Sequence, residues 1–292
     1  MPMNHTHPYI GRFAPTPTGP LHFGSLVAAL ASYLDAKSQN GKWLLRIEDL
    51  DPPREDPNAS TRIPKQLLEH GLQWDGDIQY QSQHSAQYEK ALQTLVSSNH
   101  TFHCQCSRKQ LATNNGLHLG PCLCLTQDNA AIRLQVPDAN YAFTDGVYGH
   151  IEQNLHHQVG DPILKRKDGL YAYQLAVVVD DYLSCVNHVV RGVDLLDNTP
   201  RQLFLMECLG YPAPHYLHIP LITNPQGQKL SKQNQATAID PSNAKDNLLA
   251  ALQFLNQPIN SAMRDMPITS LLQTASNSWQ ANLITPSHAG LI

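Results

Sequence analysis

The sequence lacks several features that would assign a chain to a broad class at once. Charged residues fill only 15% of its 292 positions, aromatic residues 7%, and the net charge is −4. A chain with so few charged residues is not expected to be intrinsically disordered. Its net negative charge excludes a polycation that binds nucleic acid at any place on its surface. No run of about 18 apolar residues occurs, and the N-terminus MPMNHTHPYIGR lacks a basic-then-apolar signal. We therefore expect a cytoplasmic protein with reduced thiols and no membrane partner.

Cysteines are few, and most of them are clustered. The chain has six, four of which form two Cys-x-Cys pairs between Cys104 and Cys124. In a reducing compartment such a cluster is more typical of metal ligands than of disulfides. The surrounding segment has little apolar content, so a zinc ion with four nitrogen or sulfur ligands would stabilise it. Cys185 and Cys208 lie singly among apolar residues, which predicts core positions.

Alternating strand and helix patterns indicate an α/β fold. A predicted strand at 9–14, a Pro- and Gly-rich loop, a helical pattern from Leu26 to Leu34 and a strand at 42–48 form a βαβ unit. Further helical patterns lie near 59–70, 84–98 and 198–209, and further strands at 188–192 and 216–222. We divide the chain into a first α/β half (1–99), an irregular insertion (100–170), a second half (171–240) and a short helical C-terminal region (241–292).

Two loops have the composition of phosphate-binding segments. The loop Gly19–Ser25, GPLHFGS, enters a helix, whose N-terminal N–H groups attract phosphate. It matches neither the dinucleotide fingerprint nor the P-loop, and His22 could either donate to phosphate or only cap the helix. In the second loop Lys229, Ser231 and Lys232 follow an apolar strand, and their charge suits a pyrophosphate leaving group. A solvated hairpin is the alternative interpretation of this loop.

Together these loops resemble the HIGH and KMSKS signatures of class I aminoacyl-tRNA synthetases. The blocks RFAPTPTGPLHFGS (12–25), LLRIEDLDPPR (44–54), YQSQ (80–83), VVRGVDLLDNTPRQ (189–202) and KLSKQ (229–233) resemble the catalytic domain of glutamyl-tRNA synthetases. The resemblance implies a Rossmann-type parallel sheet with a zinc-containing insertion. A short region follows the last block where glutamyl-tRNA synthetases carry an anticodon-binding region. The chain therefore resembles the truncated branch of the family, the glutamyl-Q tRNA(Asp) synthetases, as does DGLYAYQLAVVVDD (168–181).

The resemblance also implies a set of substrate-binding residues. The family's glutamate-binding positions fall on Arg12, Ala14, Thr16, Glu48, Tyr173 and Arg191. Glutamate has two carboxylates and an ammonium, and arginine binds carboxylates through paired hydrogen bonds, so two arginines and Glu48 suit this ligand. Glutamine should be rejected, because a buried arginine without a carboxylate partner is costly.

For ATP, the family's positions imply contacts from both loops. These residues are His22, Gly24, Ser25, Lys229, Ser231 and Lys232, of which His22, Lys229 and Lys232 would be catalytic. Magnesium is expected to accompany the triphosphate. Two positions depart from the signatures: Ser25 replaces the second histidine of HIGH, and Leu230 replaces the methionine of KMSKS.

The zinc ligands implied by the resemblance are Cys104, Cys106, His118 and Cys122, with His118 at a position where the family has tyrosine. Imidazole is a better zinc donor than phenol, although Cys124 remains an alternative fourth ligand. A closed set of four ligands implies a structural metal.

The resemblance implies an enzyme that activates L-glutamate with ATP and transfers it to the queuosine base at the wobble position of the tRNA(Asp) anticodon, acting as a monomer. The alternatives are a minimal synthetase that charges tRNA(Glu), a non-catalytic tRNA-binding protein, and a small nucleotidyltransferase. The tight basic clusters, Arg108 with Lys109 and the run 165–167 (KRK), are candidates for tRNA phosphate contacts. A solvated turn is the alternative at KRKDG.

Overall fold

Two groups of parallel strands form the centre of the molecule. The computed structural model describes residues 8–114, 116–122, 128–222 and 238–286. One sheet has the order β1–β2–β3, all parallel, and a second has the order β7–β6–β10–β9, in which β10 is parallel to both β9 and β6. The bounds are β1 Ile10–Phe13, β2 Lys42–Ile47, β3 Gln79–Tyr80, β6 Asn140–Asp145, β7 Gly149–Asn154, β9 His188–Gly192 and β10 His215–Ile219. The predicted α/β class with a parallel sheet is confirmed.

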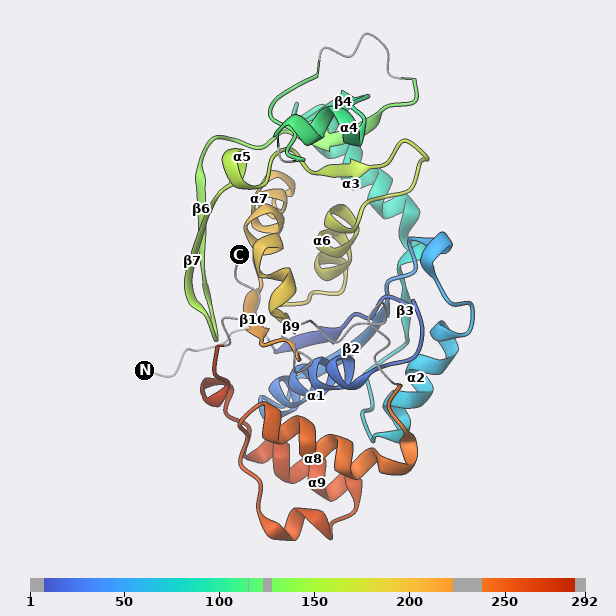
Figure 1. Ribbon diagram of the computed structural model, residues 1–292, viewed down its shortest axis with the longest axis vertical. Helices are drawn as coiled ribbons and strands as arrows, with labels where there is room; N and C mark the ends of the chain where they lie inside the picture. The colour runs from blue at the N-terminus through green and yellow to red at the C-terminus, as the bar shows by residue number, and fades with distance from the viewer. Residues whose placement is uncertain (1–7, 115, 123–127, 223–237, 287–292) are drawn as a thin grey trace.

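Hydrogen bonds at the start of β1 and β9 join the two sheets. The Ile10 backbone N–H donates to Asn187 Oδ1 at 2.8 Å, and the Asn187 N–H donates to the Ile10 carbonyl at 3.0 Å. β1 and β9 therefore lie side by side, and the carboxyl ends of β1, β2, β9 and β10 face the same edge (Figure 1). In open parallel sheets, ligands bind at this edge.

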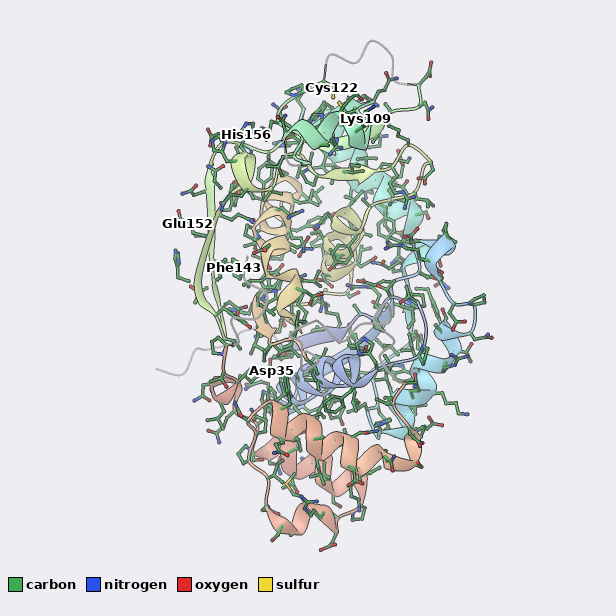
Figure 2. The ribbon with its side chains drawn as sticks, in the orientation of Figure 1. Asp35, Lys109, Cys122, Phe143, Glu152 and His156 are labelled. Atoms are coloured by element: carbon green, nitrogen blue, oxygen red, sulfur yellow. The ribbon has the colours of Figure 1, made fainter. Side chains whose placement is uncertain are left out.

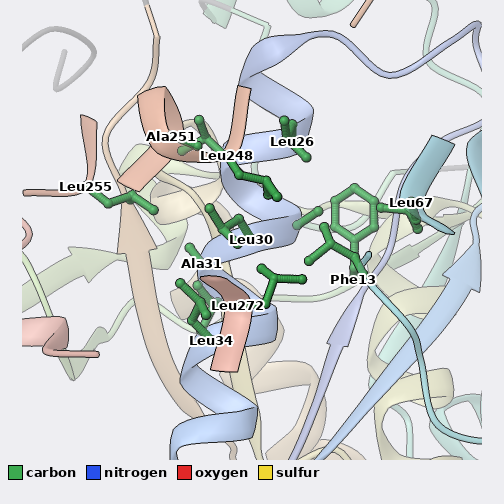
Figure 3. Close-up of a cluster of buried hydrophobic side chains, with 14 of the residues drawn as sticks. Phe13, Leu26, Leu30, Ala31, Leu34, Leu67, Leu248, Ala251, Leu255 and Leu272 are labelled. Carbon is green, nitrogen blue, oxygen red and sulfur yellow. The ribbon is translucent and has the colours of Figure 1, made fainter. Parts of the chain in front are cut away.

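Helix α1 (Phe23–Ser38) packs between the sheet and the C-terminal helices. Leu26, Leu30 and Leu34, four residues apart, are fully buried, and they face Leu248 and Leu272 of the C-terminal helices (Figure 3). Burying each leucine contributes about 1.5–3 kcal/mol relative to exposure. α1 is thus fixed from two sides, between the sheet and helices α8 (Ala244–Phe254) and α9 (Ile268–Asn277).

Helices α3 (Ser85–Ser97), α6 (Tyr173–Leu183) and α7 (Thr199–Leu209) lie in the upper part of the molecule in Figure 1. Helix α2 (Ala59–Glu69) instead packs into the same apolar cluster as α1, α8 and α9. Helices at 59–70, 84–98 and 198–209 were predicted from periodicity. α6 was not, because its run of three valines obscures the helical period, yet all three valines are buried between α3 and α7.

The segment 100–170 contains two structures of different kinds. β4 (Thr101–Cys104), β5 (Ala131–Leu134) and β8 (Ile163–Lys165) form a small antiparallel sheet next to the short helix α4 (Arg108–Leu111). The hairpin of β6 and β7, followed by the short helix α5 (Leu155–Gln158), instead extends the sheet of β9 and β10. Part of this segment therefore contributes directly to the central sheet.

The prediction that both single cysteines are core residues is wrong for Cys185. This residue is exposed in the turn after α6, with a φ of 54°, and Cys208 is half-buried on α7. Apolar neighbours in the sequence do not show that Cys185 lies in a turn and that its side chain points outward. Within the described residues, no helix is long and apolar enough to cross a membrane.

Candidate active site and metal centre

Two adjoining cavities open at the carboxyl ends of the parallel strands. One has a volume of about 370 Å³ and the other about 590 Å³. The residues that line both are Phe13, Thr16, Ala28, Gly192 and Asp194. A Cβ atom at Gly192 would lie 2.5 Å from Asp194 Oδ1, so a side chain there would crowd the junction.

The smaller cavity contains every residue that the resemblance assigns to glutamate. Arg12 lies on β1 and Arg191 on β9, while Glu48 directly follows β2. The loop after β1 and the start of α6 supply the others. The six assigned residues that line the cavity are Arg12, Ala14, Thr16, Glu48, Tyr173 and Arg191. Residues up to 179 positions apart are thus brought into one cavity by the parallel order of the strands.

The larger cavity contains the described part of the predicted ATP site. His22, Gly24 and Ser25 line it from the entrance of α1, opposite residues that follow β9 and β10. His22 caps the helix: its Nδ1 accepts the Ser25 N–H at 3.2 Å, which places the ring proton on Nε2. The capping bond uses Nδ1, and contact of the ring with phosphate remains a prediction.

The second predicted phosphate-binding loop cannot be placed in the same way. Lys229, Ser231 and Lys232 lie outside the described residues. Their roles toward ATP remain predictions.

The two arginines of the smaller cavity are held in the same manner by different partners. Arg12 donates through Nε and Nη2 to the two oxygens of Asp181, at 3.1 and 3.4 Å. Arg191 donates through Nε to His218 Nε2 at 3.0 Å and through Nη2 to Thr199 Oγ1 at 2.8 Å. In both residues Nη1 makes no hydrogen bond within the described part of the chain. Each guanidinium thus keeps its Nη1 hydrogens for a ligand.

Glu48 is a buried carboxylate that lies next to a third arginine, Arg46. Arg46, on the same face of β2, is fully buried and places its Nη2 3.6 Å from Glu48 Oε1. Burial, the largest influence, raises the pKa of Glu48 to about 7, although Arg46 and Arg12 act to lower it. A positively charged group bound in the cavity would therefore favour the ionised form of Glu48.

Sequence reasoning missed the groups that support this cavity: Arg46, Asp180 and Asp181. Asp181 accepts from Arg46 Nη1 at 2.7 Å as well as from Arg12, and Asp180 accepts from Gln81, His84 and Tyr88. The available signals were the two-residue spacing of Arg46 and Glu48 on one strand and the pair of acids that ends an apolar run in VVVDD.

Next to the small antiparallel sheet, the predicted metal ligands form one cluster. One ligand atom from each of Cys104, Cys106, His118 and Cys122 lies within 4.8 Å of the others. Three sulfurs and one imidazole nitrogen match the donors that zinc prefers, so the cluster could hold zinc in a closed tetrahedral site. Cys122 is labelled in Figure 2. The alternative ligand Cys124 lies outside the described residues.

Buried polar groups surround the cluster. Asp161 Oδ2 lies 3.0 Å from His118 Nδ1, and His118 Nε2 lies 2.8 Å from Cys122 Sγ. The carboxylate thus holds the ring proton on Nδ1 and leaves Nε2 for a metal. Burial raises the pKa of Cys104, but Arg133 and neighbouring donors outweigh it and lower the pKa, which suits a thiolate ligand.

Replacing Asp161 by asparagine is therefore expected to weaken zinc retention by about 10–100-fold. Competition with a chromogenic chelator would measure it. The matched control is Asp138→Asn, an exposed position in the same segment that does not touch the cluster. Equal zinc retention in both variants would contradict a supporting role for Asp161.

The predicted basic cluster at 165–167 is locally neutralised. Lys165 Nζ lies 2.8 Å from Glu89, and Arg166 pairs with Asp51 and Asp168. Lys167 donates to a backbone carbonyl, and Lys109 of the other cluster is exposed (Figure 2). The pairing favours the alternative interpretation, a solvated turn, while tRNA binding here stays a prediction.

Comparisons with known proteins agree with this arrangement. The family described as tRNA synthetases class I (E and Q), catalytic domain, matches residues 10–120 and 125–270. A glutamyl-Q tRNA(Asp) synthetase of Pseudomonas putida strain W619 is 50% identical over 278 residues, which cover 94% of each chain. One from Ectopseudomonas mendocina is 49% identical over 281 residues, covering 96% of each.

A solved structure has the same fold. A glutamate tRNA ligase from Elizabethkingia meningosepticum, in complex with its amino acid, superimposes with a TM-score of 0.82 at 21% identity. The match covers 96% of the present chain and 66% of that ligase. At this identity the likeness concerns the fold.

Proposed function

Because the chain belongs to the family of class I tRNA synthetases (E and Q), and is therefore a ligase, we propose that it activates L-glutamate with ATP and transfers the glutamate to the queuosine base at the wobble position of the tRNA(Asp) anticodon. The relatives at about 50% identity that carry the name glutamyl-Q tRNA(Asp) synthetase support this choice of acceptor.

The observation that carries the proposal is the content of the smaller cavity. Two buried arginines and one buried carboxylate line it, which complements a ligand with two carboxylates and one ammonium. We assign the ammonium to Glu48 and the carboxylates to Arg12 and Arg191, with Tyr173, Ala14 and Thr16 completing the walls. A neutral side chain such as that of glutamine would leave an arginine donor unpaired, which selects against it.

In the proposed first step the α-carboxylate of glutamate attacks the α-phosphorus of ATP. Glutamyl-adenylate forms and pyrophosphate leaves, with no covalent intermediate on the protein. The shared wall of the two cavities brings the reactants together, so catalysis consists of alignment and charge stabilisation. His22 donates through Nε2 to the phosphates, Gly24 and Ser25 present the helix entrance, and Lys229, Ser231 and Lys232 bind the triphosphate. Magnesium bound with ATP would supply further charge neutralisation.

The metal centre has a structural role in this proposal. Zinc bound by Cys104, Cys106, His118 and Cys122 would join the loop after β4 to the rest of the small antiparallel sheet. All four positions are protein ligands, so no position remains for a reactive water.

The decisive experiment is ATP-dependent transfer of labelled glutamate to purified tRNA(Asp), with and without queuosine, with tRNA(Glu) as the parallel acceptor. We expect label only on tRNA(Asp) that contains queuosine. Label on tRNA(Glu) instead would identify a minimal glutamyl-tRNA synthetase. Label on neither would favour a non-catalytic tRNA-binding protein.

A further inference from the structure

Arg191 occupies an unusual electrostatic position for a buried cation. It is 6% exposed, and it makes no ion pair with a carboxylate within the described residues. Its fixed contacts are neutral: the His218 ring, the Thr199 hydroxyl, the Leu195 carbonyl at 3.3 Å and the face of Tyr216 at 5.2 Å. Arg12, by contrast, is neutralised by Asp181. The charge of Arg191 is thus left for a ligand carboxylate, but its orientation depends on neutral partners.

The contact with His218 requires one tautomer of the imidazole. Arg191 Nε is a donor, so His218 Nε2 must be unprotonated to accept it. The ring proton then lies on Nδ1, which is 2.7 Å from Asp145 Oδ2. Burial, the largest influence, lowers the pKa of His218 to about 4, although Asp145 acts to raise it, so the ring is neutral near pH 7.

Asp145 is itself fixed by the backbone at the end of the β6–β7 hairpin. Its Oδ1 accepts the N–H groups of Val147 and Tyr148, both at 2.9 Å, and the His218 N–H lies 3.1 Å from Oδ2. Both Asp145 and His218 are at most 2% exposed. The carboxylate therefore has one geometry, with Oδ1 toward the turn and Oδ2 toward the imidazole.

We propose that Asp145 and His218 are positioning residues that orient Arg191 toward a substrate carboxylate, through the chain Asp145 Oδ2, His218 Nδ1–H, His218 Nε2, Arg191 Nε–H. This inference rests on the proposed function, because it takes the ligand of Arg191 to be glutamate. Neither residue lines the smaller cavity, so each acts through Arg191 and not on the substrate. The hairpin of β6 and β7 is thereby tied to substrate binding.

The substitution Asp145→Asn tests the chain with almost no change of shape. The turn N–H groups need an acceptor, so the new amide oxygen takes the Oδ1 position and its NH₂ group faces His218 Nδ1. That nitrogen must then accept, and the proton moves to Nε2, where it opposes the Arg191 Nε–H. We expect the KM for glutamate to rise about 10–100-fold, the loss typical of a hydrogen bond to a charged group, while the KM for ATP stays within about twofold.

Two substitutions of His218 separate acceptor chemistry from packing. His218→Leu removes the acceptor and should match Asp145→Asn. His218→Gln places an amide oxygen near the Nε2 position and should recover most of the affinity for glutamate. The matched control is Tyr141→Phe, which removes the hydrogen bond from β6 to Glu207 of α7 without touching Arg191, and should leave both KM values unchanged.

Imidazole ¹⁵N chemical shifts of His218 supply a readout that does not depend on turnover. The wild-type protein should show a protonated Nδ1 and an unprotonated Nε2, and Asp145→Asn should exchange them. Unchanged glutamate KM in Asp145→Asn and His218→Leu, in an active wild-type enzyme, would overturn the positioning role. A wild-type protein that transfers no glutamate would instead overturn the proposed function, and the ¹⁵N shifts would still report the tautomer.

Discussion

Replacing Glu48 by glutamine is expected to raise the KM for glutamate by about 10²–10³-fold. Glu48 is 8% exposed and lines the smaller cavity together with the two arginines. The other carboxylate of this cavity, Asp194, lies at the junction with the larger one. Glutamine has nearly the same shape but no charge, so a bound ammonium would lose its buried counter-charge. Removing one partner of a buried charge pair typically costs about 2–5 kcal/mol, which corresponds to about 30–5,000-fold in affinity, and the expected change lies in the middle of that range. Steady-state kinetics with varied glutamate would measure the change.

The same residue gives the wild-type enzyme a pH dependence with a definite sign. Its pKa is raised to about 7 in the free protein, and only the ionised form attracts ammonium. The affinity for glutamate should therefore be full above pH 7 and fall up to tenfold for each pH unit below it. Glu48→Gln should lose this dependence together with the affinity.

Glu152→Gln is the control for this substitution. Glu152 lies on β7, exposed and far along the hairpin from the cavity, and is labelled in Figure 2. It should leave both the KM and its pH profile unchanged. If Glu48→Gln kept the wild-type profile, another group would hold the ammonium.

The second large effect is expected on stability, from Asp181→Asn. Asp181 is 4% exposed and accepts from both Arg12 and Arg46, so its loss leaves two buried guanidinium groups without their shared counter-charge. Breaking a buried pair in this way typically lowers the free energy of unfolding by about 3–5 kcal/mol. Denaturant-induced unfolding, followed by circular dichroism, would measure it. Arg12 would also lose its fixed orientation, so glutamate binding should weaken.

The pH dependence of this contribution follows from the direction of the pKa shift. Burial alone would raise the pKa of Asp181, but Arg12 and Arg46 outweigh it and lower the pKa below its usual value. The stabilisation is therefore present above about pH 4 and disappears as the pH falls through the folded-state pKa. Asp168→Asn, at an exposed acid paired with Arg166, should cost only about 0–1 kcal/mol. Equal losses in the two variants would contradict a special role for the buried acid.

Much of the fold could be predicted from local patterns. β1, β2 and α7 lie within one residue of their predicted bounds, and α1 contains the predicted pattern and extends it by about one turn at each end. α6 was not predicted as an element, and the short strands expected between about 100 and 170 could not be given bounds. α6 is buried on several sides and so shows no clear apolar stripe, and the short strands β5 and β8 depend on pairing with distant partners.

The residues of the site also differ in whether local sequence patterns could predict them. Residues that touch the proposed substrates lie within recognisable sequence blocks, so Arg12, Glu48 and Arg191 could be named in advance. Their supporting partners could not, because the contacts span the chain: 169 residues separate Arg12 from Asp181, and 73 separate Asp145 from His218. The sequence alone does not show whether an aspartate or glutamate is buried or exposed, and only the fold distinguishes the two cases.

The packing of α1 has a consequence for engineering this protein. The helix that presents His22 rests on α8 and α9, and the Trp279 indole beyond α9 donates to Asp35 of α1 at 2.9 Å. The region after residue 240 therefore supports the helix that borders the larger cavity and is packed as part of the same core. Removing it to obtain a smaller enzyme would expose the apolar face of α1 and loosen the turn that carries His22, so such trimming would damage catalysis from a distance.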